Sequence, residues 1–362
     1  MLALLSLALI THPAPPRPAR PPVHPGAVQV TVDSNAHTVT LTAGPFSLPA
    51  GHPGEHHGMG MMMGDHSMEL PLEYFKWPIT GSLRGFHLMV TDADGRPLNR
   101  RLIHHFNLIN FGRRQLFYAV PEITLAVGQE TPDIVFPKTV GIPMEQGWPM
   151  ALIFMWHNES PEPVPVVNVK LVLEYNPPNL FPRPTMVLPV YMDVQNPVAS
   201  KVTFDLPPGR TEWHADYQLP TSGRIIGIGG HAHDYATGLA LQEVLDGRVR
   251  TVASVRTTLD SAGRLTAIEQ KLPGIRGRGI PLTAGHTYRV WGAYNSPAAD
   301  TMKDGAMVHI VYLFAPDRLS DWPKVDHENA DWKRDVAWLD ARGENYQDGG
   351  MDPNMDMGGH TH

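Results

Sequence analysis

Cysteine is absent from the 362 residues of this chain. No disulfide can form, and no thiolate is available to bind a metal ion. Any transition-metal site must therefore be built from imidazole, carboxylate or thioether groups. The chain is well supplied with two of these, because it contains 19 histidines and 17 methionines.

Clusters of basic residues are also lacking. The net charge is −7, and Lys and Arg gather no further than pairs such as Arg113-Arg114. A protein that binds nucleic acid needs a basic patch to neutralise phosphates. We therefore expect no nucleic acid among the partners.

The N-terminus lacks an apolar run long enough to span a bilayer, since the run from Leu2 to Ile10 is too short. This run resembles the apolar part of a signal peptide, although no basic residues precede it; a short disordered tail is the alternative. A stiff Pro-rich stretch follows. Residues 1–26 are thus expected to be a signal-like segment and linker. The protein is expected to be periplasmic or secreted, and not membrane-spanning after signal removal.

Helical periodicity is lacking before residue 328, and short β-branched runs separated by turns take its place. The stretch "VQVTVDSNAHTVTLT" (28–42) alternates on both sides of a turn and predicts a hairpin. The fold class predicted is all-β, with two tandem β-sandwich, jelly-roll-like domains and a short C-terminal helix. In that helix Trp332, Val336 and Leu339 share one face.

The Pro-rich segment "NPPNLFPRP" (176–184) is the best candidate for a domain boundary. The expected parts are an N-terminal sandwich (27–180), a C-terminal sandwich (181–317) and a C-terminal extension (318–362). Residues 51–68 form a Met/His-rich loop in the first sandwich, and residues 349–362 form a tail of the same composition. Such segments bind metal ions with modest affinity, or serve no function at all.

Histidines on predicted strands are the candidate metal ligands. A single residue separates His231 from His233, so a strand directs both imidazoles to the same side. The adjacent pair His104-His105 can reach one metal ion only through a local distortion of its strand, or by using different ring nitrogens. Further candidates are His157, at the end of an apolar strand, and Met307 and His309, on one face of another strand. A lone histidine of this kind is more often an ordinary core or surface residue.

The order of these residues, HH, then His, then HxH, then Met, resembles the copper type II, ascorbate-dependent monooxygenases, the family of peptidylglycine α-hydroxylating monooxygenase and dopamine β-monooxygenase. The flanking segments "FPKTVG" (136–141), "LPPGRTEWHADYQLP" (206–220) and "MKDGAMVHIVYLF" (302–314) are similar to segments of that family too. The resemblance covers about residues 28–316.

The resemblance implies two β-sandwiches with a solvent-filled cleft between them and two coppers per chain. By motif, one copper would be held by His104, His105 and His157. The other, catalytic copper would be held by His231, His233 and Met307. The activity implied is hydroxylation of a C–H bond in a small-molecule substrate, with O2 and with ascorbate or another one-electron donor as reductant. With no thiolate present, imidazole and thioether donors independently favour copper over zinc.

The chain departs from the family in several places. It has no disulfides, and Gly229, His309 and Val311 stand where the peptide enzyme anchors a glycine carboxylate. Met155 stands where the family has glutamine, and it could contact copper or pack in the core. His309 could replace or join Met307 as a ligand, or act as a hydrogen-bonding group behind the ligands.

Two other classes of function remain open. The protein could be a non-catalytic extracytoplasmic copper-binding protein for sequestration or delivery, with a copper donor or acceptor protein as its partner. It could also be a cupin-type jelly roll that uses HxH. A cupin needs a glutamate shortly after that motif, and the nearest one here is Glu243.

Overall fold

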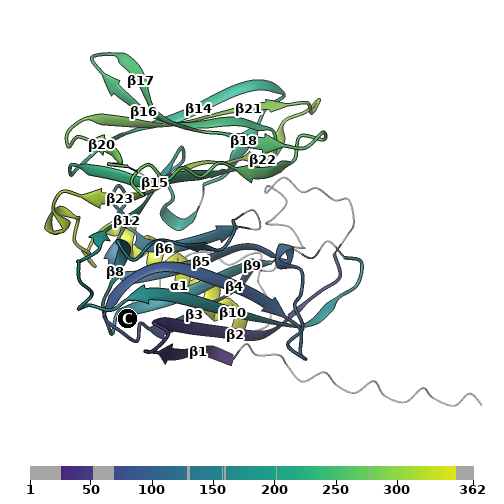
Figure 1. The fold of residues 1–362 in the computed structure, drawn as a ribbon. Coiled ribbons are helices and arrows are strands. Elements are labelled where there is room, and N and C mark those ends of the chain that lie inside the picture. Colours follow the sequence, from purple (N-terminus) through teal and green to yellow (C-terminus); the bar gives the residue numbers. More distant parts are fainter. Residues whose placement is uncertain are drawn as a thin grey trace, which may run out of the picture.

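The computed structural model describes residues 26–51, 69–128, 131–156, 158, 160–200, 202–275 and 277–347. Over these residues the chain is built from strands, with one α-helix, α1 (Ala330–Gln347), near its end. Figure 1 shows the main sheets stacked as layers, with the second half of the chain lying on the first. The predicted all-β fold with a short C-terminal helix is confirmed.

The first sandwich packs a seven-stranded sheet against a four-stranded one. The larger sheet contains β1 (Gly26–Asp33), β2 (Thr38–Leu48), β10 (Val164–Asn176), β4 (Gly81–Thr91), β8 (Val140–Met144), β11 (Thr185–Met186) and β7 (Ile134–Val135). The smaller sheet has the order β3 (Glu69–Lys76), β9 (Pro149–Trp156), β5 (Ile103–Arg114), β6 (Pro121–Gly128). The hairpin predicted over 28–42 is formed by β1 and β2. Alternate residues of these strands form one buried core, in which Phe154 contacts Phe46 and Phe106.

The second sandwich pairs two four-stranded sheets. One has the order β12 (Leu188–Asp193), β23 (Val308–Pro316), β15 (Gly223–Ala232), β20 (Ile280–Leu282). The other has the order β14 (Gly209–Gln218), β21 (Thr287–Ser296), β16 (Ala236–Leu245), β17 (Arg248–Val255). Two short ribbons complete it: β13 (Phe204–Leu206) with β22 (Met302–Ala306), and β18 (Thr257–Leu259) with β19 (Leu265–Ile268). Its core is a second, separate apolar cluster.

The chain passes from one sandwich to the other between β11 and β12, because β11 pairs with β8 and β12 pairs with β23. The predicted boundary segment, 176–184, lies just before this point.

The two sandwiches pack against each other through a sheet of the second one. Ile226 of β15 belongs to the core of the first sandwich, and Leu313 and Ala315 of β23 pack against that core. This contact brings β5 and β15 together, which matters for the histidines that they carry.

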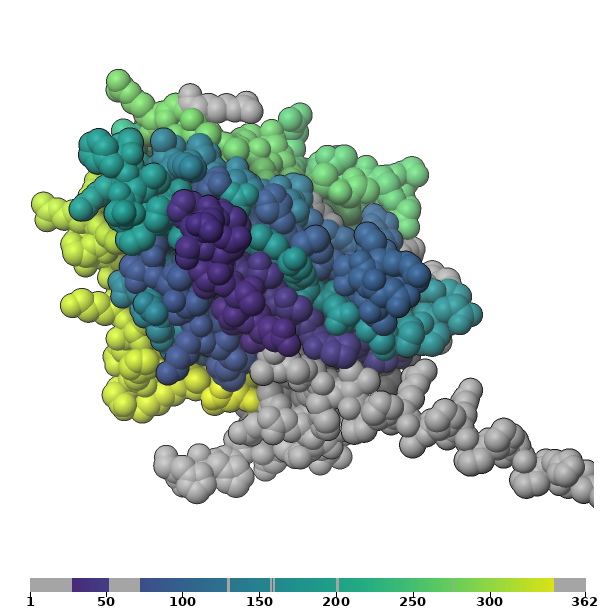
Figure 2. Space-filling model, turned by 60° about the horizontal axis from the view of Figure 1, so that its bottom comes forward, coloured from purple at the N-terminus to yellow at the C-terminus, as the bar shows by residue number. Residues whose placement is uncertain are grey.

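Helix α1 returns to the first sandwich and packs on β3. Asn329 caps its first turn by accepting hydrogen bonds from the backbone N–H groups of Asp331 (2.9 Å) and Trp332 (3.3 Å). Leu339 contacts the outer face of the smaller sheet, as the predicted amphipathic face requires. Figure 2 shows this C-terminal part of the chain, in yellow, beside the strands of the first sandwich. Among the described residues, none of the helices combines the length and apolar character that a membrane crossing requires.

Candidate metal centre

Histidines from both sandwiches meet in one cluster. The ring centroids of His105 and His231 are 4.8 Å apart, although the two residues belong to different sandwiches. The remaining centroid distances are 4.3 Å for His104–His105, 5.8 Å for His231–His233 and 5.9 Å for His231–His309. We expected the two ligand sets to face each other across a solvent-filled cleft. The structure instead brings His105 and His231 into contact, because β15 and β23 pack against the first sandwich at this point.

His104 and His105 reach the same side of β5 through a β-bulge. Ile103 pairs with Trp156, and His105 pairs with Met155, so His104 is the extra residue on its strand. A bulge bends the strand and redirects one side chain, which is why neighbouring rings lie together here. Of the two ways by which this pair could reach one metal ion, the local distortion of the strand is present. The same register sets Met155 opposite His105, on the cluster's side of the sheet.

The second sandwich presents its histidines from a neighbouring strand pair. His231 of β15 lies directly opposite His309 of β23, and Ala232 lies opposite Val308. Directly opposed residues share a face of the sheet, so both imidazoles point toward the first sandwich. The structure thus brings together the rings of His104, His105, His231, His233 and His309. The backbone of Met307 lies beside that of His233, because both donate to the same tyrosine hydroxyl. His157 lies outside the described residues.

A glycine before the HxH motif allows the two strands to approach. A Cβ at Gly230 would lie 2.6 Å from the backbone oxygen of His309 and 2.7 Å from Cδ1 of Leu239. A Cβ at the preceding Gly229 would lie 3.6 Å from Cγ of Gln270, which is ordinary contact. Packing beside the cluster therefore requires a glycine at position 230 but not at position 229.

Gly230→Ala should lower the free energy of unfolding by about 1–3 kcal/mol, because a backbone carbonyl cannot move aside as a flexible side chain can. Gly229→Ala is the matched control and should change it by less than about 0.5 kcal/mol. Denaturant unfolding of the two metal-free variants measures the difference. Equal stabilities would show that the strands are not packed as closely as described.

A buried tyrosine from the opposite sheet fixes the backbone of the cluster. The Tyr294 hydroxyl accepts hydrogen bonds from the backbone N–H groups of His233 (3.2 Å) and Met307 (3.1 Å). It donates to the Met307 carbonyl. Burial raises the pKa of Tyr294 to about 12, so the hydroxyl keeps the proton that it donates. Nothing in the sequence pattern pointed to Tyr294, because its partners come from distant strands.

The ring nitrogens of two histidines are arranged as metal ligands usually are. Nδ1 of His309 contacts the carboxylate of Asp193, while His233 hydrogen-bonds to the backbone of Gly305. Nε2 of each ring is buried and has no hydrogen-bond partner among the described residues. Histidines that bind metals typically donate one ring N–H to a carboxylate or carbonyl and offer the other nitrogen to the ion. The residues present thus fit a metal ion.

Burial also favours the ligating protonation state of His105 and His233. Burial lowers the pKa of His105 and that of His233 well below the usual value, and the neighbouring imidazoles lower both further. Neutral imidazole carries the lone pair that a metal ion needs. Among the described residues, no three His, Asp or Glu side chains yet converge on one point as a metal-holding group. Side-chain rotation is therefore needed for the rings to close on an ion.

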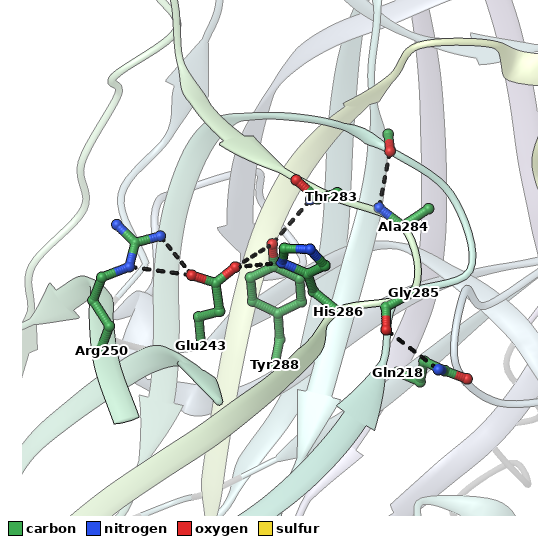
Figure 3. A network of polar contacts seen from close by, with 9 residues as sticks. Gln218, Glu243, Arg250, Thr283, Ala284, Gly285, His286 and Tyr288 are labelled. Carbon is green, nitrogen blue, oxygen red and sulfur yellow. Dashed lines mark hydrogen bonds and ion pairs between the residues drawn. The ribbon is translucent and has the colours of Figure 1, made fainter. Parts of the chain in front are cut away.

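The carboxylate that a cupin-type site needs is engaged elsewhere. Glu243 accepts hydrogen bonds from Nη2 (2.6 Å) and Nε (3.1 Å) of Arg250, and its other oxygen lies 2.7 Å from Nδ1 of His286. Figure 3 shows this network, which also includes Tyr288. The network holds β16, β17 and β21 together at their edges, and it engages both carboxylate oxygens of Glu243. The cupin alternative is therefore not supported.

A recess of about 480 Å³ lies at another place between the sandwiches. Tyr118 from the first sandwich and Tyr217 from the second both line it, whereas the clustered histidines do not. A hollow between the domains therefore exists, but the candidate ligands do not border it.

Comparison with known proteins gives no family. No family model matches the sequence, and no curated protein matches it. PNGase F, a glycosylasparaginase from Flavobacterium meningosepticum, has a TM-score of 0.37 and 10% identity, over 78% of this chain and 96% of that one. The major capsid protein P2 of bacteriophage PM2 has a TM-score of 0.32 and 12% identity, over 70% of this chain and 98% of that one. Similarity this low says nothing about activity.

Proposed function

We propose that this protein is an extracytoplasmic copper-dependent monooxygenase. In this proposal it hydroxylates a C–H bond of a small substrate with O2 and a one-electron donor such as ascorbate. The observation that carries the proposal is the histidine cluster at the junction of the sandwiches. Within it, His233 and His309 each have one anchored ring nitrogen and one buried ring nitrogen without a partner. Imidazole and thioether donors, with no thiolate in the chain, suit copper.

Each sandwich would hold copper through its own residues. His104 and His105 would bind from the bulge in β5, and His157 would complete that set. His231 and His233, with Met307, would bind from the second sandwich. Copper bound there would supply the reductive activation of O2 that C–H hydroxylation requires.

The other residues keep these ligands ready to bind. Tyr294 fixes the backbone of His233 and Met307 through three hydrogen bonds. Burial lowers the pKa of His105 and that of His233, which favours the neutral form that binds a metal ion. The chain would thus supply position and charge state for the chemistry.

A second candidate is a copper protein without catalysis, for sequestration or delivery. The burial of the ring nitrogens of His233 and His309 favours it, because a closed site suits an ion that is held. The Met/His-rich residues 51–68 and 349–362 would then collect copper from a donor protein or pass it to an acceptor. Most of the first segment and all of the second lie outside the described residues.

Oxygen uptake separates the two candidates. Copper-reconstituted full-length protein with ascorbate should consume O2 faster when a hydroxylatable small molecule is added, and 18O from O2 should enter the product. Zinc-loaded protein is the control, because zinc has no redox chemistry. Peptides that end in glycine should not be hydroxylated, since Gly229 and Val311 supply no cationic partner for the carboxylate. If no substrate in a broad panel stimulates O2 uptake, this would contradict the proposed monooxygenase and favour the non-catalytic copper protein.

A further inference from the structure

His309 occupies the centre of a row of polar side chains that crosses three strands. In β23 it lies directly opposite His231 of β15 on one side and Asp193 of β12 on the other. All three side chains therefore share the face that meets the first sandwich. The rings of His309 and His231 are T-shaped, with their planes at 72°.

Asp193 is fixed in place by two tyrosines. Its backbone N–H donates to the hydroxyl of Tyr118 (2.9 Å), and its carbonyl accepts from the hydroxyl of Tyr217 (2.5 Å). Tyr118 donates in turn to Tyr217 (2.7 Å), which closes a ring of hydrogen bonds. Only 3% of the Asp193 side chain is exposed, so its carboxylate has little water to solvate it. A buried carboxylate needs a hydrogen-bonding or cationic partner, and the Nδ1 of His309 is in contact with it.

This contact determines how the His309 ring is used. A carboxylate at Nδ1 holds the proton there, so the lone pair of the neutral ring lies on Nε2. That nitrogen is buried and has no hydrogen-bond partner among the described residues. A histidine with a purely structural role would have its second nitrogen satisfied or in water, because leaving a buried polar atom unpaired is costly. A metal ion is the partner that this arrangement lacks.

We infer that His309 is a metal ligand, joining His231 and His233 at the centre in the second sandwich, and that Asp193 is the residue that orients it. This inference rests on the proposed function and extends it. The centre then has three imidazole donors beside Met307. Nitrogen donors are harder than a thioether, so the added imidazole favours Cu(II) relative to a site with two imidazoles and a thioether. The contact of the Asp193 carboxylate with Nδ1 fixes the orientation of the His309 ring.

Copper(II) alone, titrated into the full-length metal-free protein, tests this role. His309→Ala should weaken the binding of one copper by more than about 10-fold, and should remove one nitrogen from the hyperfine pattern in its electron paramagnetic resonance spectrum. Asp193→Asn should weaken binding about 10- to 100-fold but keep the number of nitrogens unchanged. His214→Ala removes an exposed histidine of β14 and should change neither quantity.

The outcomes separate this inference from the proposed function. If His231→Ala loses one copper but His309→Ala keeps wild-type affinity and spectrum, His309 is not a ligand and the inference is wrong while the copper centre stands. If the wild type binds no copper that depends on His231, the proposed function fails as well. Circular dichroism of each metal-free variant checks folding. Should His309→Ala not fold, Asp193→Asn decides, because unchanged affinity there contradicts the orienting role.

Discussion

Replacing His233 with alanine is expected to lower the affinity for one copper by more than about 100-fold and to remove nearly all oxygen-dependent turnover. The imidazole is anchored through Gly305, and its backbone N–H is held by Tyr294. Its Nε2 has no other partner among the described residues. Losing one of the two chelating imidazoles of the HxH pair leaves the copper one donor short, so binding should weaken and turnover should fall.

Isothermal titration with a competing chelator measures the affinity, and an oxygen electrode measures turnover at saturating copper. The His214→Ala variant, which removes an exposed histidine, is the control. Its copper affinity and its turnover should match those of the wild type. Tight binding of two coppers by His233→Ala would show that this residue is not a ligand.

Copper removal is expected to destabilise both sandwiches together. The two copper sites would lie next to each other at the junction of the sandwiches, since His105 and His231 are in contact, so emptying them should loosen both domains. A ligand that binds only the folded state at a concentration 1,000 times its Kd stabilises a protein by about 4 kcal/mol. Calorimetry should show this loss after chelation. Hydrogen exchange should show faster opening in strands of both sandwiches, such as β9 and β21.

Two variants identify the source of this coupling. With His105→Ala, copper should still protect the second sandwich but should protect the first sandwich much less. Met155→Leu changes the residue opposite His105 without removing an imidazole, and it should retain the coupling if Met155 only packs. Copper protection confined to the second sandwich in the wild type would contradict a cluster shared between the domains.

Much of the fold could be predicted because it depends on local patterns. Alternation of apolar residues gave the hairpin over 28–42, and spacing along the chain gave the buried face of α1 with Trp332 and Leu339. The same-side placement of His231 and His233 also follows from strand geometry alone. Even the bulge at His104 could be anticipated, because two adjacent residues cannot otherwise share a face.

The rest depends on contacts between residues far apart in the chain. That His105 touches His231 follows from how two sheet faces pack, and no local pattern records it. The roles of Asp193 and Tyr294 depend on strand neighbours and on the opposite sheet, so their positions in the sequence carried no signal. The resemblance to copper monooxygenases supplied an order of ligands. It also implied that the two ligand sets face each other across a cleft, whereas the recess between the sandwiches is lined by other residues.

The central claim is that histidines of both sandwiches form one copper-binding cluster. Anomalous diffraction on both sides of the copper absorption edge, from crystals of the copper-loaded full chain, tests it most directly. The account predicts anomalous density at the junction of β5, β15 and β23, about 2.0–2.1 Å from imidazole nitrogens of both sandwiches, those of His104 or His105 and those of His233 and His309; this is the length of an imidazole bond to a first-row metal ion. Copper density only at other sites, with none within bonding distance of these histidines, would contradict it.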